Sequence, residues 1–233
     1  MREPVGEDRR RPARSSVTWC IRAPLAAWLR EQAERAAQRG AHDVLDVGCG
    51  VKAYAPFFAG ATRYVGVDLP GNRFADIAGP ADAIPVDDAS FDLVLCLQVL
   101  EHVPDPAAVV RELRRVVKPG GRVLASTHGV YVYHPNPDDL WRWTHTGLER
   151  LFRAHGNWSA VTVTPSSGTT ACVAMLAAHY VDLLFKHARL RFLARPLVAG
   201  LNSTANAIDR AVPILREPIP GSLFANYHVV ADA

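Results

Sequence analysis

Short apolar runs alternate with longer segments of helical spacing along most of this chain. The runs at 43–48, 62–69, 91–97 and 122–127 are short and rich in branched residues, which is typical of buried strands. Apolar residues recur at helical spacing between them and over 22–39, where Gly40 ends the pattern. Strands that alternate with helices in this way predict a mainly parallel sheet covered on both faces.

Local signals add detail to this pattern. Asp105 followed by Pro106 predicts the start of a helix, because Asp is a good N-cap and Pro fits the first helical position. Thr146 and Glu149 have capping-box spacing and predict a second helix start.

The last third of the chain changes character. Residues 159–166 alternate as a strand and residues 226–233 form a final apolar strand. Between them the composition shifts to long apolar helical segments. We therefore predict a helical insertion at about 171–215, before the last strand.

Composition narrows the class of protein. Residues 1–16 are polar, with mixed charge, and are expected to form a flexible tail in front of one domain over 17–233. The net charge of +3 is too small to indicate nucleic-acid binding. The cysteines are scattered without a CxxC pair, so neither a metal site nor disulfides are indicated and a cytoplasmic location fits. We find no signal peptide and no apolar run long enough for a membrane span.

The turn after the first strand carries the most specific chemistry. Residues 48–53, GCGVKA, match the dinucleotide pattern G-x-G-x-x-A, but this match alone is weak. Asp46 argues against a dinucleotide, because a carboxylate would repel a pyrophosphate, whereas it suits an ammonium group. Asp68 ends the second strand, where an acid can accept hydrogen bonds from ribose hydroxyls. A nucleoside that carries an amino acid, S-adenosylmethionine, meets both conditions.

With these motifs the sequence resembles the class I S-adenosylmethionine-dependent methyltransferases, of the type 11 kind. The stretches that carry the resemblance are VLDVGCG, YVGVDL, ADAIPVDDASFDLVLCLQVLEHVPDP and RELRRVVKPGGRVLAST. The resemblance implies a Rossmann-like, doubly wound α/β fold with a mainly parallel sheet of seven strands. Residues 17–233 would then be the methyltransferase domain.

The resemblance also implies a cofactor site at the strand ends. Asp68 would bind the ribose, Asp82 the adenine amino group, and Asp46 would lie by the methionine moiety. Leu69 would pack on the adenine, Ala83 would donate a backbone contact, and Leu97 would contribute its main chain. The expected set in the turns and strand ends is Asp46, Gly48, Cys49, Gly50, Asp68, Leu69, Asp82, Ala83 and Leu97.

One position departs from the family pattern. Lys52 stands where a third glycine is common, in a GVKAY run. Lys52 and Tyr54 are expected to reach the cofactor carboxylate. The alternative is a surface lysine and a core tyrosine.

Three histidines near strand ends are candidates for a general base: His102, His128 and His134. Histidine titrates near neutrality, which suits proton removal from an acceptor. The alternative for each is a structural, hydrogen-bonded role. The aromatic loop over 131–143 is expected to line the acceptor pocket through Tyr131, Tyr133, Trp141 and Arg142, or else to form a structural corner.

The helical insertion combines apolar faces with basic residues at Lys186, Arg189, Arg191 and Arg195. Three interpretations remain open. The insertion caps the pocket or forms a homodimer, it rests on an anionic membrane surface, or its basic residues hold an acidic substrate.

The predicted function is methyl transfer from S-adenosylmethionine to a small-molecule acceptor in secondary-metabolite or glycan biosynthesis, with oxygen favoured over nitrogen or carbon. The alternative is a non-catalytic, methyltransferase-like scaffold protein. The complete set of acids at the strand ends favours an enzyme. A nucleic-acid substrate is disfavoured, because LQVLEH stands where an NPPY-like run would follow the third strand.

Overall fold

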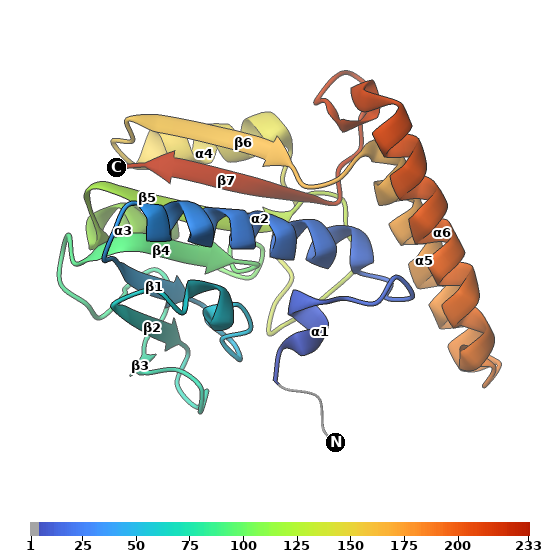
Figure 1. The fold of residues 1–233 in the computed structure, drawn as a ribbon, viewed down its shortest axis with the longest axis horizontal. Helices are drawn as coiled ribbons and strands as arrows, with labels where there is room; N and C mark the ends of the chain where they lie inside the picture. The colour runs from blue at the N-terminus through green and yellow to red at the C-terminus, as the bar shows by residue number, and fades with distance from the viewer. Residues whose placement is uncertain (1–4) are drawn as a thin grey trace.

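A seven-stranded sheet in the order β3-β2-β1-β4-β5-β7-β6 forms the centre of the computed structural model (Figure 1). The structure describes residues 5–233, apart from the side chain of Arg191. Strands β1 to β5 pair in parallel, and β7 is antiparallel to both β5 and β6. The bounds are β1 Asp43–Val47, β2 Arg63–Asp68, β3 Ile77–Ala78, β4 Phe91–Leu97, β5 Val117–His128, β6 Ala160–Pro165 and β7 Asn226–Asp232. The predicted doubly wound α/β fold is confirmed.

Helices cover both faces of the sheet (Figure 1). On one face, α2 packs Leu25 and Leu29 against β1 and β4. On the other face lie α3 and α4, which belong to a separate apolar cluster. The helices are α1 Glu7–Arg10, α2 Trp19–Gln38, α3 Pro106–Val116, α4 His145–His155, α5 Thr169–His187 and α6 Arg191–Ala211, with short 3₁₀ turns η1 Ala55–Phe58 and η2 Pro213–Arg216.

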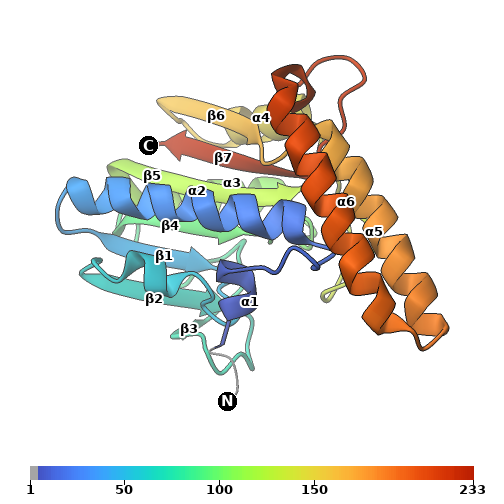
Figure 2. The ribbon, with the colours of Figure 1, turned by 45° about the vertical axis from the view of Figure 1, so that its right-hand side comes forward.

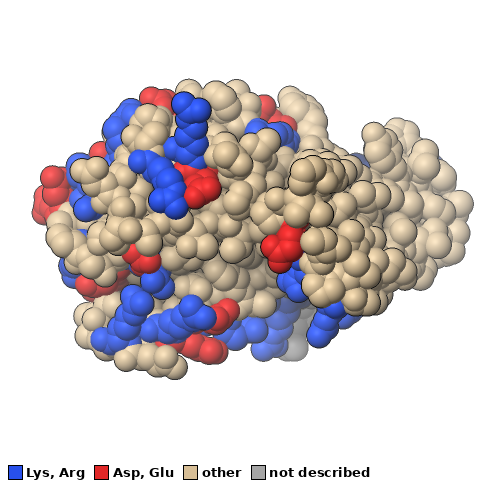
Figure 3. Space-filling model, turned by 90° about the horizontal axis from the view of Figure 1, so that it is seen from above, with Lys and Arg blue, Asp and Glu red and all other residues tan. Residues whose placement is uncertain are grey.

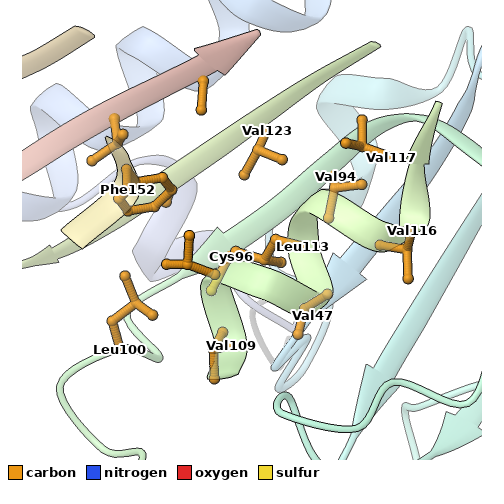
Figure 4. Packing of buried hydrophobic residues seen from close by; sticks show 14 of the residues in the cluster. Val47, Val94, Cys96, Leu100, Val109, Leu113, Val116, Val117, Val123 and Phe152 are labelled. Atoms are coloured by element: carbon orange, nitrogen blue, oxygen red, sulfur yellow. The ribbon is translucent and has the colours of Figure 1, made fainter. Parts of the chain in front are cut away.

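The apolar face of α3 shows why this segment is helical. Val109, Leu113 and Val116 recur every three or four residues and are fully buried. They pack in one cluster with Val94 and Cys96 of β4 (Figure 4). Burial of each such side chain contributes roughly 1.5–3 kcal/mol to folding. This packing holds β4, and therefore its carboxyl end, in place.

The two predicted helix starts have different outcomes. Asp105 caps α3 as expected, since its side chain accepts a hydrogen bond from the Ala108 N–H at 3.0 Å. The predicted capping box of Thr146 and Glu149 is wrong, because α4 is capped two residues earlier by Thr144, whose hydroxyl accepts from the Gly147 N–H at 3.1 Å.

The reason lies in a long-range contact. The Trp143 N–H donates to the His128 carbonyl at 3.0 Å, which holds the chain extended up to Thr144. Glu149 instead pairs with Arg153 at 2.9 Å.

We expect Thr144→Ala to lower the free energy of unfolding by about 1 kcal/mol, because it removes an N-cap hydrogen bond. Thr146→Ala is the matched control and should change it by no more than about 0.5 kcal/mol, as exposed positions usually do. Urea unfolding followed by circular dichroism measures both. A larger loss for Thr146→Ala than for Thr144→Ala would contradict the cap assignment.

The predicted helical insertion is confirmed between the last two strands. Helices α5 and α6 run antiparallel as a pair and project beyond the sheet on the side of the carboxyl ends of β1 and β4 (Figures 1 and 2). Within residues 5–233, no helix has both the length and the hydropathy that a membrane crossing requires.

The N-terminal segment differs from the flexible tail expected over residues 1–16. Residues 1–4 lie outside the described residues. Residues 5–16 contain α1 and lie against the domain: Arg10 donates to the Ala53 carbonyl at 2.5 Å, and Asp8 pairs with Arg22 of α2 at 2.7 Å. The described part of this segment therefore belongs to the domain surface.

Candidate functional site

A cavity of about 770 Å³ opens at the carboxyl ends of β1, β2 and β4. Open α/β sheets bind their ligands at this edge. The glycine turn and the end of β2 form one wall, and the loops after β4 and β5 form the opposite wall. Residues of α1 and the first turns of α2 close the cavity from the side of the N-terminus.

The glycine turn after β1 requires glycine at two positions. Gly48 has φ +69°, and a Cβ there would lie 2.4 Å from Cγ2 of Val99. Gly50 has φ +53°, a conformation that other residues adopt only at a cost. Both glycines line the cavity. The turn therefore brings backbone atoms close to whatever occupies the cavity.

Asp68, at the end of β2, organises this wall. Its Oδ2 accepts from the Gly50 N–H at 2.8 Å and from Asn72 Nδ2 at 2.7 Å, and its Oδ1 accepts from the Leu69 N–H at 2.7 Å. Leu69 and Asp82 line the cavity next to it. This carboxylate thus links the glycine turn to the loop after β2 while it faces the cavity.

Asp46 has a different place from the one expected. It is 5% exposed, does not line the cavity, and accepts a hydrogen bond from the Tyr64 hydroxyl at 2.6 Å. Burial raises the pKa of Asp46 to about 7, against the opposing effects of the Tyr64 hydrogen bond and of Lys52. The structure places this carboxyl behind the glycine turn, where it acts on a ligand only through the turn.

The two predicted residues of the GVKAY run also lie in different places. Tyr54 lines the cavity, whereas Lys52 does not. Lys52 forms an ion pair with Asp76, which also accepts from the Gly66 N–H at 2.7 Å. The expected contact of Lys52 with a cofactor is therefore corrected to a structural ion pair. Cys49 packs behind the turn and Ala83 lies outside the wall, while Leu97 lines it as expected.

Two arginines in the wall were missed. Arg9 of α1 and Arg22 of α2 both line the cavity, and the Arg9 guanidinium lies close to Gly50. Arg9 belongs to the RRRPAR run that was assigned to a tail. The packing of α1 on Ala53 brings this charge to the cavity, and no local pattern could have indicated that.

The three candidate histidines come together around a buried acid, Glu101. His128 Nε2 lies 3.4 Å from Glu101 Oε1, and His102 Nε2 lies 4.0 Å from the same oxygen. The ring of His134 is 5.9 Å from that of His102 and 6.3 Å from that of His128, between centroids. All three histidines line the cavity.

Glu101 was not among the predicted site residues. Its side chain is fully buried, and Oε2 accepts from the Thr127 hydroxyl at 2.8 Å. A fully buried acid is unusual, and the LEH run did not indicate that the Glu101 side chain would point into the core. Its neighbour His102 was the residue that the sequence singled out.

Burial disfavours the charged forms of Glu101, His128 and His134. It raises the pKa of Glu101 to about 7, and burial together with nearby Arg142 lowers the pKa of His128 to about 3. The pKa of His134 is also lowered, chiefly by burial and then by His102. At neutral pH His128 is therefore a neutral imidazole, while Glu101 is poised to ionise when a positive charge enters the cavity.

Only one of the four expected acceptor-binding residues lines the cavity. Tyr131 does, stacked on His128 at 4.0 Å between ring centroids. Tyr133 is 81% exposed and points away. Trp141 donates through Nε1 to the Val103 carbonyl at 2.8 Å. Arg142 donates to the Asp139 carboxylate and to the Val132 carbonyl. Trp141 and Arg142 therefore form a structural corner, which was the alternative to a role in acceptor binding.

Gln98, directly after β4, is a further residue of the wall that was missed. It has φ +59°, a strained value for a residue other than glycine. Its side chain donates to Ser126 Oγ at 2.9 Å and to Asn226 Oδ1 at 3.0 Å. These bonds to β5 and β7 hold the turn that carries the backbone of Leu97 into the cavity.

Comparison with known proteins agrees with this geometry. Residues 45–125 match a family model described as a methyltransferase domain. An S-adenosylmethionine-dependent methyltransferase from Archaeoglobus fulgidus superimposes with a TM-score of 0.55 and 14% identity, over 97% of both chains. Residues 45–125 are therefore a methyltransferase domain, and the sheet around them has the fold of the S-adenosylmethionine-dependent methyltransferases. The cofactor of this class is S-adenosylmethionine.

Relatives with assigned names are similar to part of this chain. A ubiquinone biosynthesis O-methyltransferase from Ralstonia nicotianae is 39% identical over 116 residues, which is 43% of this chain and 47% of the relative. The chain thus matches less than half the length of that relative. The [4+2]-cyclase SpnF has the same fold, with a TM-score of 0.53 and 20% identity over 87% of this chain and 80% of the cyclase. The fold alone therefore does not decide the reaction.

The residues present fit the cofactor. Asp68 offers carboxylate oxygens at the end of β2, Leu69 offers an apolar surface, and the glycine turn allows close approach. Arg9 and Arg22 add positive charge on the side of the glycine turn, which suits a carboxylate. The wall thus combines groups for a sugar, a base and an amino acid in one cavity.

Proposed function

We propose that this methyltransferase transfers the methyl group of S-adenosylmethionine to a hydroxyl oxygen of a small-molecule acceptor in a biosynthetic pathway. The observation that carries the proposal is the pair of His128 and Glu101 in the cavity wall, with Nε2 and Oε1 3.4 Å apart. The family and the named O-methyltransferase relative support it. Transfer to oxygen requires removal of a proton, and this pair offers a means to do so.

The proposed cofactor contacts follow from the wall of the cavity. Asp68 would accept hydrogen bonds from the ribose hydroxyls, with Leu69 against the adenine and Asp82 near its amino group. Arg9 and Arg22 would hold the carboxylate. When bound, S-adenosylmethionine supplies a methyl group on a positively charged sulfur.

The residues of the opposite wall would then handle the acceptor. Tyr131 offers a flat surface for it beside His128. His128 would take the acceptor's proton at Nδ1, which has no hydrogen-bond partner among the described residues. The acceptor oxygen forms its bond to the methyl carbon as the carbon–sulfur bond breaks and its electron pair returns to sulfur. Ionised Glu101 would orient His128 through Nε2 and stabilise its protonated form.

The setting of the reaction is part of the proposal. Secondary-metabolite or glycan biosynthesis in the cytoplasm is the context that we favour. All four cysteines are free and buried, which suits a reducing compartment.

The test has two steps. S-adenosylhomocysteine should bind and raise the melting temperature, because a ligand that binds only the folded state stabilises it. S-adenosylmethionine labelled in its methyl group should then deliver the label to hydroxylated small molecules, and mass spectrometry of the product should locate it on oxygen. Label found on nitrogen or carbon would contradict oxygen transfer, and absence of cofactor binding would contradict the whole proposal.

A further inference from the structure

The tip of the helix pair has a composition unlike the rest of the molecule. We define the tip as residues 183–197, the end of α5, the connection and the start of α6. From Leu183 to Ile208 the sequence contains no Asp or Glu. Lys186, Arg189 and Arg195 lie within the tip and are exposed. Asp182 of α5 lies one residue before the tip, so the tip carries an excess of basic residues over acids.

Large apolar side chains are exposed beside these basic residues. Leu184 and Phe192 are each 67% exposed, and the other apolar residues exposed in the tip are Leu183, Leu190, Leu193 and Leu197. Seen from above, charged side chains gather over the sheet domain, while the end formed by α5 and α6 shows few (Figure 3). A cluster of this size at one end of a molecule marks an interaction site.

The position of the tip suits contact with an extended surface. Helices α5 and α6 project past the sheet, so that the tip stands clear of the other elements (Figures 1 and 2). The base of α5 is anchored, since Cys172 and Met175 are fully buried against Ile21 of α2. His179 contacts Tyr131 of the cavity at 5.6 Å between ring centroids. The tip is therefore carried on a helix that also touches the wall of the site.

We propose that the tip docks on a membrane surface that contains anionic lipid. Leucine and phenylalanine side chains would enter the boundary between headgroups and acyl chains, and Lys186, Arg189 and Arg195 would lie among the headgroups. The choice of partner rests on charge. A second copy of the tip would bring two surfaces with an excess of basic residues together, whereas phosphate headgroups complement them.

The experiment measures co-sedimentation of the whole chain with vesicles of phosphatidylcholine, with and without phosphatidylglycerol. We expect binding to the vesicles with phosphatidylglycerol, and weakening by salt because the attraction is screened. Replacing both Arg189→Gln and Arg195→Gln should lower the vesicle partition coefficient by about 25-fold, at about fivefold for each basic residue. Leu184→Gln with Phe192→Gln should lower it by more than about tenfold.

The matched control lies at the other end of the helix pair. Ile214→Gln with Arg216→Gln changes one residue of each kind, apolar and basic, both exposed, and should leave vesicle binding unchanged. Binding of S-adenosylhomocysteine should survive in every variant, which shows that each one folds and separates this test from that of the proposed function.

Two results would overturn the proposal. One is that the unchanged chain binds neither kind of vesicle, or that the tip and control variants bind equally well. The other is that sedimentation velocity shows a dimer that Leu184→Gln with Phe192→Gln converts to monomer, while vesicles are not bound. The tip would then be an interface between two copies.

Discussion

Asp68→Ala should weaken the binding of S-adenosylhomocysteine roughly 100-fold, because it removes charge-assisted hydrogen bonds to both ribose hydroxyls. Part of the loss would come from the turn itself. Asp68 accepts hydrogen bonds from the Gly50 N–H and the Leu69 N–H, at 2.8 and 2.7 Å. Isothermal titration calorimetry measures the change in dissociation constant.

The control for Asp68 is an exposed acid away from the cavity. Glu34 of α2 is exposed and does not line the cavity, so Glu34→Ala should leave the affinity unchanged. Asp68→Asn adds a second comparison, since it keeps the shape of the side chain but loses the charge. Its affinity for S-adenosylhomocysteine should fall between those of Asp68→Ala and Glu34→Ala. An Asp68→Ala variant that is folded and binds with unchanged affinity would show that the ribose lies elsewhere.

Glu101→Gln should lower kcat by about 100-fold, within the range that acid–base groups contribute, and should leave cofactor affinity unchanged. Glu101 acts through His128, so it is a positioning residue rather than a catalytic one. The glutamine keeps the shape and is still able to accept from the Thr127 hydroxyl, but it cannot stabilise a protonated His128. Steady-state kinetics with labelled cofactor measures kcat and KM separately.

The pH profile distinguishes this role from a merely structural one. The pKa of Glu101 is raised to about 7, so the unmodified protein should gain activity as pH rises towards that value and the carboxyl ionises. This rise should be absent in Glu101→Gln. Glu149→Gln, an equivalent change in a surface ion pair with Arg153, serves as the control. A Glu101→Gln variant with the original kcat and the original pH profile would exclude the pair from catalysis.

The stability of Glu101→Gln gives an independent check. A buried carboxyl with a raised pKa keeps its proton in the folded state, while the unfolded chain releases it above pH of about 4.5. The carboxyl's contribution to stability therefore falls as pH rises from about 4.5 to about 7. The difference in free energy of unfolding between the unmodified protein and the glutamine variant should therefore fall across this window. Below pH of about 4.5 this difference should not change with pH.

The sequence by itself determined the order of the elements and the glycine turn. Strand and helix periodicity are local properties, and they predicted the sheet, α2, α3 and the helix pair before β7. Gly48, Gly50 and Asp68 were predicted for the cavity because the turn and the strand end carry their chemistry in a few adjacent residues. Leu97 and Asp82 were implied by the family resemblance, and both line the cavity.

Only the tertiary structure decided which side chains point into the cavity. Asp46 and Lys52 each lie two residues from a glycine of the turn. Asp46 nevertheless accepts a hydrogen bond from Tyr64, and Lys52 pairs with Asp76, so neither side chain points into the cavity. Trp141 and Arg142 likewise donate hydrogen bonds to the backbone carbonyls of Val103 and Val132. The direction in which a side chain points depends on partners from distant parts of the chain, and the local sequence pattern does not indicate those partners.

The same reason explains what was missed. Arg9 reaches the cavity because α1 packs on Ala53, and Arg22 reaches it from the first turns of α2. Glu101 lies between His128 and Thr127, residues of β5 that are separated from it by the whole of α3. A buried acid beside a neutral histidine arises from packing, since it is the loss of water around both groups that shifts their pKa values. The residue types in a sequence indicate which chemistry is available. Burial and contacts between distant segments decide which of these residues are placed to take part in a reaction.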